Sequence, residues 1–141
     1  MLAFATAFGR VLSLTKAADA INGFLVSRFS TQFGVLTVLV LLFLLLGTVM
    51  DTGPAIVILA PVLLPAVEAL GVDAVHFGVV LVCCLSIGLA TPPFGLDLFV
   101  AGKLSEEKPM TVAKRALPFM LAFFAALLLI TYLPFLSTAL L

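Results

Sequence analysis

Two short segments of this sequence combine acids, threonines, glycines and prolines, residue types that could bind a hard cation and a polar substrate. They are residues 47–54, GTVMDTGP, and residues 88–97, GLATPPFGLD. Hard cations such as Na⁺ favour oxygen ligands, by the same logic as Ca²⁺ and Mg²⁺. Carboxylates and hydroxyls supply such oxygens directly, and glycine leaves backbone carbonyls open to close approach. We therefore predict an ion and substrate site at these two segments.

The first segment centres on Asp51. An ionised acid at the bilayer centre costs roughly 2.5–3.5 kcal/mol on insertion scales, so it persists where it faces a cavity, a cation or a partner. Thr48 and Thr52 offer hydroxyl oxygens beside it, and Gly47 and Gly53 leave carbonyls accessible. The alternative is a helix cap, with Asp51 or Thr52 at the N-cap and a proline in the first turn. Both roles can hold at once.

The second segment is interrupted by two adjacent prolines, Pro92 and Pro93. Because proline has no N–H, the carbonyls of residues 87–89 are predicted to lose their helical partners. Those carbonyls, with the Thr91 hydroxyl, could form a cation site at the C-terminal end of a half-helix. The alternative is a simple proline kink.

Two sets of site residues follow from these segments. The predicted cation ligands are Gly47, Thr48, Asp51, Thr52, Gly88 and Thr91. The predicted substrate-binding residues are Asp51, Thr52, Gly53, Pro93, Gly95 and Asp97. Asp97 either faces the cavity or caps the short helix that follows, and Ser86 could add a hydroxyl before the break.

The composition is that of an integral membrane protein. Of 141 residues, 64% are hydrophobic, against ~45–50% in a soluble domain, and the mean hydropathy is +1.37. Seven basic and seven acidic residues cancel, which argues against a nucleic-acid partner. The charges also cluster, leaving uncharged apolar stretches between them, which is the pattern of membrane segments.

Breaks inside such apolar stretches restrict the architecture. Lipid offers no partner to freed N–H and C=O groups, so non-helical backbone at membrane depth survives only inside protein or beside a polar cavity. Paired breaks of this kind point to the binding site of a transporter. The predicted all-α elements are the end of a helix (residues 1–14), an amphipathic surface helix (15–30), a re-entrant hairpin (33–69), a broken transmembrane helix (73–104), a charged cytoplasmic segment (105–115) and a last transmembrane helix (116–134).

Several of these elements have alternatives. The hairpin could instead be two full spans joined by an exposed turn at residues 51–54, and the surface helix could be an ordinary connecting helix. Asp73 is expected to cap the helix that follows it. Four of the seven basic residues lie between Lys103 and Arg115, which puts that segment in the cytoplasm by a small margin.

The sequence argues against an enzyme. His76 is the only histidine, and it lies near a helix start, where we expect an interfacial side chain bonded to Asp73 rather than a proton relay. The adjacent Cys83 and Cys84 have no zinc-type spacing and are predicted to be packing residues. No set of nucleophile and base is present.

The two broken segments, with their neighbours, resemble the C-terminal part of the large membrane subunit (permease) of TRAP transporters, the tripartite ATP-independent periplasmic transporters of the ion-transporter superfamily. The resemblance covers nearly the whole chain, most securely from Leu36 onward. The stretches that carry it are residues 45–51 (LLGTVMD), 58–65 (ILAPVLLP), 70–78 (LGVDAVHFG), 87–96 (IGLATPPFGL) and 116–119 (ALPF).

The resemblance implies an elevator-type secondary transporter of the bacterial inner membrane. Such permeases import organic acids, C4-dicarboxylate-like or sugar-acid-like, with Na⁺, and a periplasmic substrate-binding protein delivers them. A small four-helix membrane subunit accompanies the permease. By this resemblance residues 47–53 are a hairpin tip and residues 88–95 a broken-helix loop. Family members often have Asn where Asp97 stands, a departure that affects the charge and the substrate fit of the site.

The matching residues correspond to the second of two inverted repeats, so the remaining half of the permease is an expected partner, beside the lipid bilayer. The chain is then a fragment, a truncated product or half of a split permease. Alternatives are a fragment of another elevator-type citrate or dicarboxylate Na⁺ symporter, or a non-transporting membrane remnant or assembly subunit.

Overall fold

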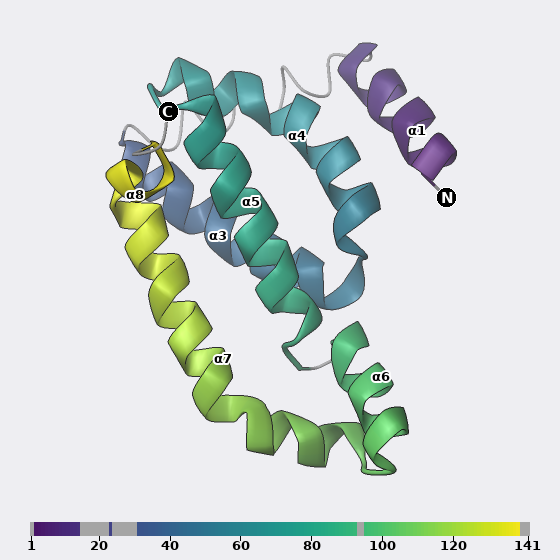
Figure 1. Ribbon diagram of the computed structural model, residues 1–141. Helices are drawn as coiled ribbons and strands as arrows, with labels where there is room; N and C mark the ends of the chain where they lie inside the picture. The colour runs from purple at the N-terminus through teal and green to yellow at the C-terminus, as the bar shows by residue number, and fades with distance from the viewer. Residues whose placement is uncertain (1, 15–22, 24–30, 93–94, 139–141) are drawn as a thin grey trace.

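The computed structural model describes residues 2–14, 23, 31–92 and 95–138. All secondary structure in that part of the chain is helical, as predicted (Figure 1). The helices are α1 (Leu2–Leu14), α3 (Gln32–Val49), α4 (Thr52–Ala69), α5 (Ala74–Leu89), α6 (Leu96–Ser105), α7 (Pro109–Tyr132) and α8 (Pro134–Thr138).

Three of these helices are long and apolar enough to cross a membrane. They are α3 and α4, with 18 residues each, and α7, with 24 residues. At 1.5 Å per residue, 18 residues span roughly 27 Å, close to the ~30 Å of a hydrocarbon core. The 16 residues of α5 are apolar but shorter, and α6 follows after an interruption.

Helix α5 is the central element of the fold. It packs along α3 and also against α4, whereas α3 and α4 contact each other only slightly (Figure 1). Helix α1 packs on the outside of α4. The core between α3 and α5 includes the edge-on ring pair of Phe43 and Phe77, whose centroids lie 6.0 Å apart.

Helices α3 and α5 approach each other very closely at Gly47 and Gly88. A Cβ added to Gly88 would lie 2.6 Å from the Gly47 Cα, and one added to Gly47 would lie 2.7 Å from the Leu85 carbonyl oxygen. Real side chains do not approach backbone so closely, so this crossing requires glycine on both helices. Small residues let helix backbones meet in membranes, where packing rather than the hydrophobic effect drives association.

Polar contacts tie the helices together at one end of the molecule. The Gln32 side chain donates a hydrogen bond to the Gly71 carbonyl, which joins the start of α3 to the connection between α4 and α5. The Thr37 and Tyr132 hydroxyls lie 2.9 Å apart, linking α3 to α7. The connection between α6 and α7 lies at the opposite end (Figure 1).

The observed helix bounds differ from the predicted ones at the charged segment. Helix α7 begins at Pro109, so Lys114 and Arg115 lie on its first turns rather than ahead of the last transmembrane helix. Lys108 has the extended backbone of an N-cap, and a proline at the first helical position suits a helix start. The predicted amphipathic helix over residues 15–30 lies outside the described residues except for Gly23.

Replacing Gly88 by alanine should destabilise the fold, because the new methyl group must push α3 and α5 apart. Overpacking of this kind typically costs about 1–3 kcal/mol. Gly78 is the matched control, since it lies in the same helix and an added Cβ meets nothing within 4 Å. Gly78→Ala should be neutral or stabilising, because glycine is a poor helix former. Thermal unfolding in detergent measures both variants, and equal effects would contradict the close contact.

Candidate functional site

The candidate site lies where the two broken segments meet. The first break separates α3 from α4, and the second separates α5 from α6. The contact of Gly47 with Gly88 brings them together. Figure 1 shows the connection between α3 and α4 near the level of the break between α5 and α6.

The first break is a single extended step between two helices. Helix α3 ends at Val49, the Met50 N–H still donates to the Leu46 carbonyl at 2.8 Å, and α4 begins at Thr52. Asp51 has the extended backbone of the α4 N-cap, but its carboxylate makes no capping hydrogen bond. The capping alternative is therefore correct for the position of Asp51 and wrong for its side chain, which is exposed.

Thr48, in the last turn of α3, and Thr91, just beyond the end of α5, both bond a preceding backbone carbonyl through their hydroxyls. The Thr48 hydroxyl donates to the Leu45 carbonyl at 2.8 Å, and the Thr91 hydroxyl donates to the Ile87 carbonyl at 2.7 Å. Each hydroxyl donates its only hydrogen to a carbonyl of the preceding helical turn. Its oxygen keeps lone pairs that can accept a hydrogen bond or bind a cation. A threonine oxygen of this kind can contribute to a cation site without breaking the helix.

At the second break, the Ile87 and Gly88 carbonyls still accept hydrogen bonds from residues that precede the prolines. Besides the Thr91 hydroxyl, the Ile87 carbonyl accepts from the Ala90 N–H at 3.2 Å, and the Gly88 carbonyl accepts from the Thr91 N–H at 2.9 Å. The Ile87 and Gly88 carbonyls thus lack their i+4 helical donors, as predicted, but they are not left unpaired, because i+3 bonds replace the helical ones. The chain tightens to shorter-range bonds before the prolines, and Thr91 supplies a further donor.

The Leu89 carbonyl is the exception. Its helical donor would be Pro93, which has no N–H, and no hydrogen bond to this carbonyl is found among the described residues. A Cβ added to Gly95 would lie 3.2 Å from the Leu89 oxygen and 3.0 Å from the Thr91 oxygen, so both carbonyls converge on Gly95. The left-handed φ of +44° at Gly95 also favours glycine. The sequence pointed to the Thr91 hydroxyl and, through the proline spacing, to the Leu89 carbonyl, but not to the Thr91 carbonyl beside Gly95.

The remaining predicted residues are spread around the break. Thr52 is half-buried at the start of α4, and Gly53 is exposed. Asp97 is exposed in the first turn of α6, where its charge suits the helix dipole, but the N-cap of this helix is Gly95. Pro93 lies outside the described residues.

The backbones of the two segments meet at Gly47 and Gly88, whereas Asp51 and Asp97 are both exposed. The described residues contain no group of three or more His, Cys, Asp or Glu that could hold a metal ion. The oxygen donors present are hydroxyls, carbonyls and separate carboxylates, a set that fits a hard monovalent cation better than a transition metal.

Asp73 and His76 lie at the other end of α5 from the break. The Asp73 carboxylate accepts from the backbone N–H groups of Val75 at 2.8 Å and His76 at 3.2 Å, which confirms the predicted cap. The His76 ring does not bond Asp73 as expected. It is buried, and its Nδ1 lies 2.8 Å from the Ser137 hydroxyl of α8.

Comparison with known proteins identifies the family. A family model described as the DctM component of the tripartite ATP-independent periplasmic transporter matches residues 1–136. The chain belongs to this family. It is 37% identical over 134 residues to the isethionate TRAP transporter permease protein DctMQ of Oleidesulfovibrio alaskensis, covering 95% of this chain and 21% of that protein.

Two further relatives are large permease proteins of Vibrio cholerae. The C4-dicarboxylate TRAP transporter protein DctM is 38% identical over 115 residues, covering 79% of this chain and 25% of the relative. The sialic acid TRAP transporter protein SiaM is 30% identical over 129 residues, covering 92% of this chain and 30% of the relative. The chain thus spans between about a fifth and a third of the length of these relatives.

Replacing each N-cap aspartate by alanine should show that Asp51 and Asp73 contribute differently to the stability of the fold. Asp73→Ala removes two hydrogen bonds to the first turn of α5 and should cost about 1 kcal/mol of stability. Asp51→Ala should cost clearly less, because the Asp51 carboxylate makes no capping bond. Thermal unfolding of both variants in the same detergent is the measurement, and a larger loss at Asp51 would show that its carboxylate supports the fold.

Proposed function

We propose that this chain forms part of the substrate pathway of a Na⁺-coupled secondary transporter that imports organic acids. The observation that carries the proposal is the contact of the two broken segments at Gly47 and Gly88. The family supports a transporter permease. The names of the relatives specify isethionate, C4-dicarboxylates and sialic acid, all of which are organic acids.

In this proposal, the ends of the broken helices and the neighbouring oxygen atoms together bind the charged ligands. The C-terminal end of α5, with its partial negative charge and the Leu89 and Thr91 carbonyls, favours a cation. Thr48, Asp51 and Thr52 would add oxygens from the hairpin, beside the carbonyls of the two contacting glycines. Bound Na⁺ would supply the positive charge that offsets an anionic substrate.

The N-terminal ends of α4 and α6 would face the substrate, because their free N–H groups favour anions. Asp51 and Asp97 are the acids nearest those two helix starts. Their charges oppose an anionic ligand, so in this proposal Na⁺ must be bound for the substrate carboxylate to be accepted. This requirement would couple the two ligands energetically.

We also propose that α3 and α4 form a re-entrant hairpin. The connection between α3 and α4 lies near the level of the second break, well short of the level of the connection between α6 and α7 (Figure 1). A tip at mid-depth would keep its freed backbone groups inside protein or a polar cavity. The bases of both legs lie together, since Gln32 bonds the Gly71 carbonyl.

The proposed partners follow from the length of the relatives. A transporter site must close alternately from two sides, and carriers built from repeats place it between the repeats. One hairpin and one broken helix provide one wall, so the remaining permease would provide the other. A small membrane subunit and a periplasmic binding protein would complete the system in the bacterial inner membrane.

Thr91→Ala should raise the Na⁺ concentration needed for half-maximal uptake by about three- to tenfold, since one lost oxygen contact is worth about 1 kcal/mol. The matched control is Thr131→Ala, which removes an equivalent hydroxyl bond, 2.8 Å to the Leu127 carbonyl. Uptake by the complete transporter in proteoliposomes is the measurement. An unchanged Na⁺ dependence in both Thr91→Ala and Asp51→Ala would leave these residues as kink and cap only.

Cysteine labelling should separate the re-entrant hairpin from two full spans. A membrane-impermeant thiol reagent applied from the side of the charged segment should modify Glu106→Cys, because Glu106 is exposed at that corner. Asp51→Cys should react far more slowly, because a mid-depth tip does not reach that surface. Equal labelling of the two positions would favour two full spans.

A further inference from the structure

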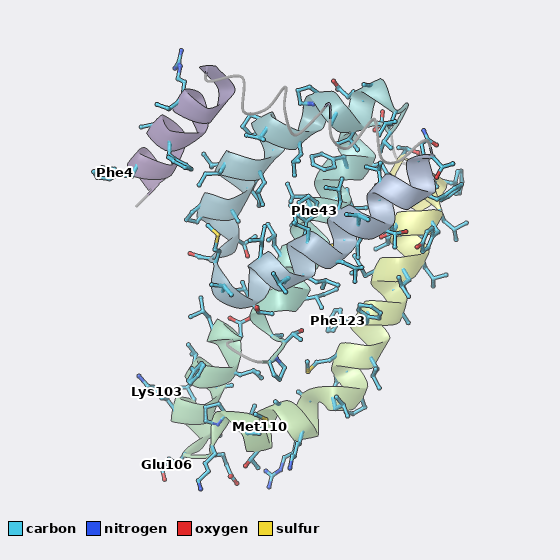
Figure 2. The ribbon with its side chains drawn as sticks, turned by 180° about the vertical axis from the view of Figure 1, so that it is seen from behind. Phe4, Phe43, Lys103, Glu106, Met110 and Phe123 are labelled. Atoms are coloured by element: carbon cyan, nitrogen blue, oxygen red, sulfur yellow. The ribbon has the colours of Figure 1, made fainter. Side chains whose placement is uncertain are left out.

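A single pair of side chains joins the short helix α8 to the start of α5. The His76 Nδ1 lies 2.8 Å from the Ser137 hydroxyl, across 61 positions of the sequence, and His76 is 1% exposed. Figure 2 shows α8, in yellow, far from the corner labelled Lys103 and Glu106. The pair therefore ties the base of the broken helix to the segment that follows α7.

The other ring nitrogen of His76 is left without a partner. Nε2 is buried, and no hydrogen bond to it is found among the described residues. A neutral imidazole has one N–H and one lone pair. If the Ser137 hydroxyl donates to Nδ1, Nε2 carries a hydrogen without an acceptor. If Nδ1 donates instead, Nε2 keeps a lone pair without a donor. In either tautomer a polar atom is buried at a cost that contact with water would remove.

Few other interactions hold α8 on α5. Its five residues, Pro134–Thr138, include none that is buried, and Phe135 is 76% exposed. The Thr138 hydroxyl bonds the Pro134 carbonyl at 3.1 Å, which lies within α8 itself. The attachment of α8 therefore depends mainly on the bond of Ser137 to His76.

The backbone between α7 and α8 forms a joint. Leu133 has φ −117° and ψ 80°, which is not helical. Pro134 has no N–H to give to the Ile130 carbonyl, its helical acceptor. The end of α7 is held separately, because the Tyr132 and Thr37 hydroxyls lie 2.9 Å apart. A rotation at Leu133 can thus carry α8 off α5 while α7 keeps its place.

We propose that α8 is a releasable latch on α5, with docked and released states of similar free energy. Docking gains the bond to Ser137 but leaves Nε2 unpaired, and these two effects are of similar size. Release exposes both ring nitrogens to water. In the proposed transporter, release would free the base of α5, so that the broken helix could shift relative to α7. The role of release in transport rests on the proposed function, whereas the latch itself does not.

Paired spin labels in the complete permease, with its native cysteines replaced, measure the two states. Leu41→Cys on α3 and Leu136→Cys on α8 are exposed positions for the labels. Double electron–electron resonance should show a docked and a released distance. Ser137→Ala should raise the ratio of released to docked protein about fivefold, because docking then leaves both nitrogens of His76 unpaired.

The double variant His76→Phe/Ser137→Ala separates a latch from a loosely packed segment. A phenyl ring has no polar atom to leave unpaired, so the double variant should be no more released than the unmodified protein. Thr138→Ala is the matched control, since it removes a neighbouring hydroxyl whose bond stays within α8, and it should change nothing. Equal effects of Ser137→Ala and Thr138→Ala, or a double variant as released as Ser137→Ala, would overturn the latch.

Uptake in proteoliposomes tests the role of release. The double variant should lower the maximal rate at saturating Na⁺ at least twofold and leave the Na⁺ concentration for half-maximal uptake unchanged. A folded double variant that stays docked and transports at the normal maximal rate would overturn this role. Uptake by the unmodified protein that does not depend on Na⁺ would instead contradict the proposed function, and the two distances would still decide the latch.

Discussion

The close contact of Gly47 with Gly88 is the constraint on which the rest of the structure depends. Two helices can approach until backbone meets backbone only where neither has a Cβ, and both positions fulfil this condition. The Leu85 carbonyl oxygen lies beside Gly47 and the Leu44 carbonyl oxygen beside Gly88, so backbone packs directly on backbone at this crossing. The crossing brings the end of α3 beside the end of α5, so the breaks that follow these two helices lie close together.

A break in a membrane helix leaves backbone N–H and C=O groups without helical partners. The two breaks of this chain limit the number of such groups in different ways. At the first break the step is short, and α4 begins almost as soon as α3 ends. At the second break Thr91 satisfies the Ile87 and Gly88 carbonyls, while the proline at position 93 leaves the Leu89 carbonyl without its helical donor. The Leu89 oxygen near Gly95 is therefore a consequence of proline chemistry, and it lies at the negative end of α5.

The two ends of the molecule are held differently. At one end, side chains from α3, α5, α7 and α8 bond each other through Thr37, Tyr132, His76 and Ser137. At the other end, α6 and α7 meet at an exposed charged corner, and the described ion pair there is weak. Helix α7 is buried near its C-terminus at Leu127 and Thr131, and its first turns, which precede Pro118, bend away from that part of the helix (Figure 1). Its large exposed surface needs lipid or other parts of the transporter.

Local chemistry determined much of this protein from the sequence alone. The apolar lengths predicted membrane helices, the prolines and glycines located both breaks, and Asp73 was recognised as a cap, because each of these features depends on neighbouring residues only. The tertiary structure decided the rest. The pairing of Gly47 with Gly88, the bond of His76 to Ser137 rather than Asp73, and the convergence of carbonyls on Gly95 depend on how distant helices cross. Helix crossing is set by packing and turn geometry over the whole chain, which no local pattern of residues specifies.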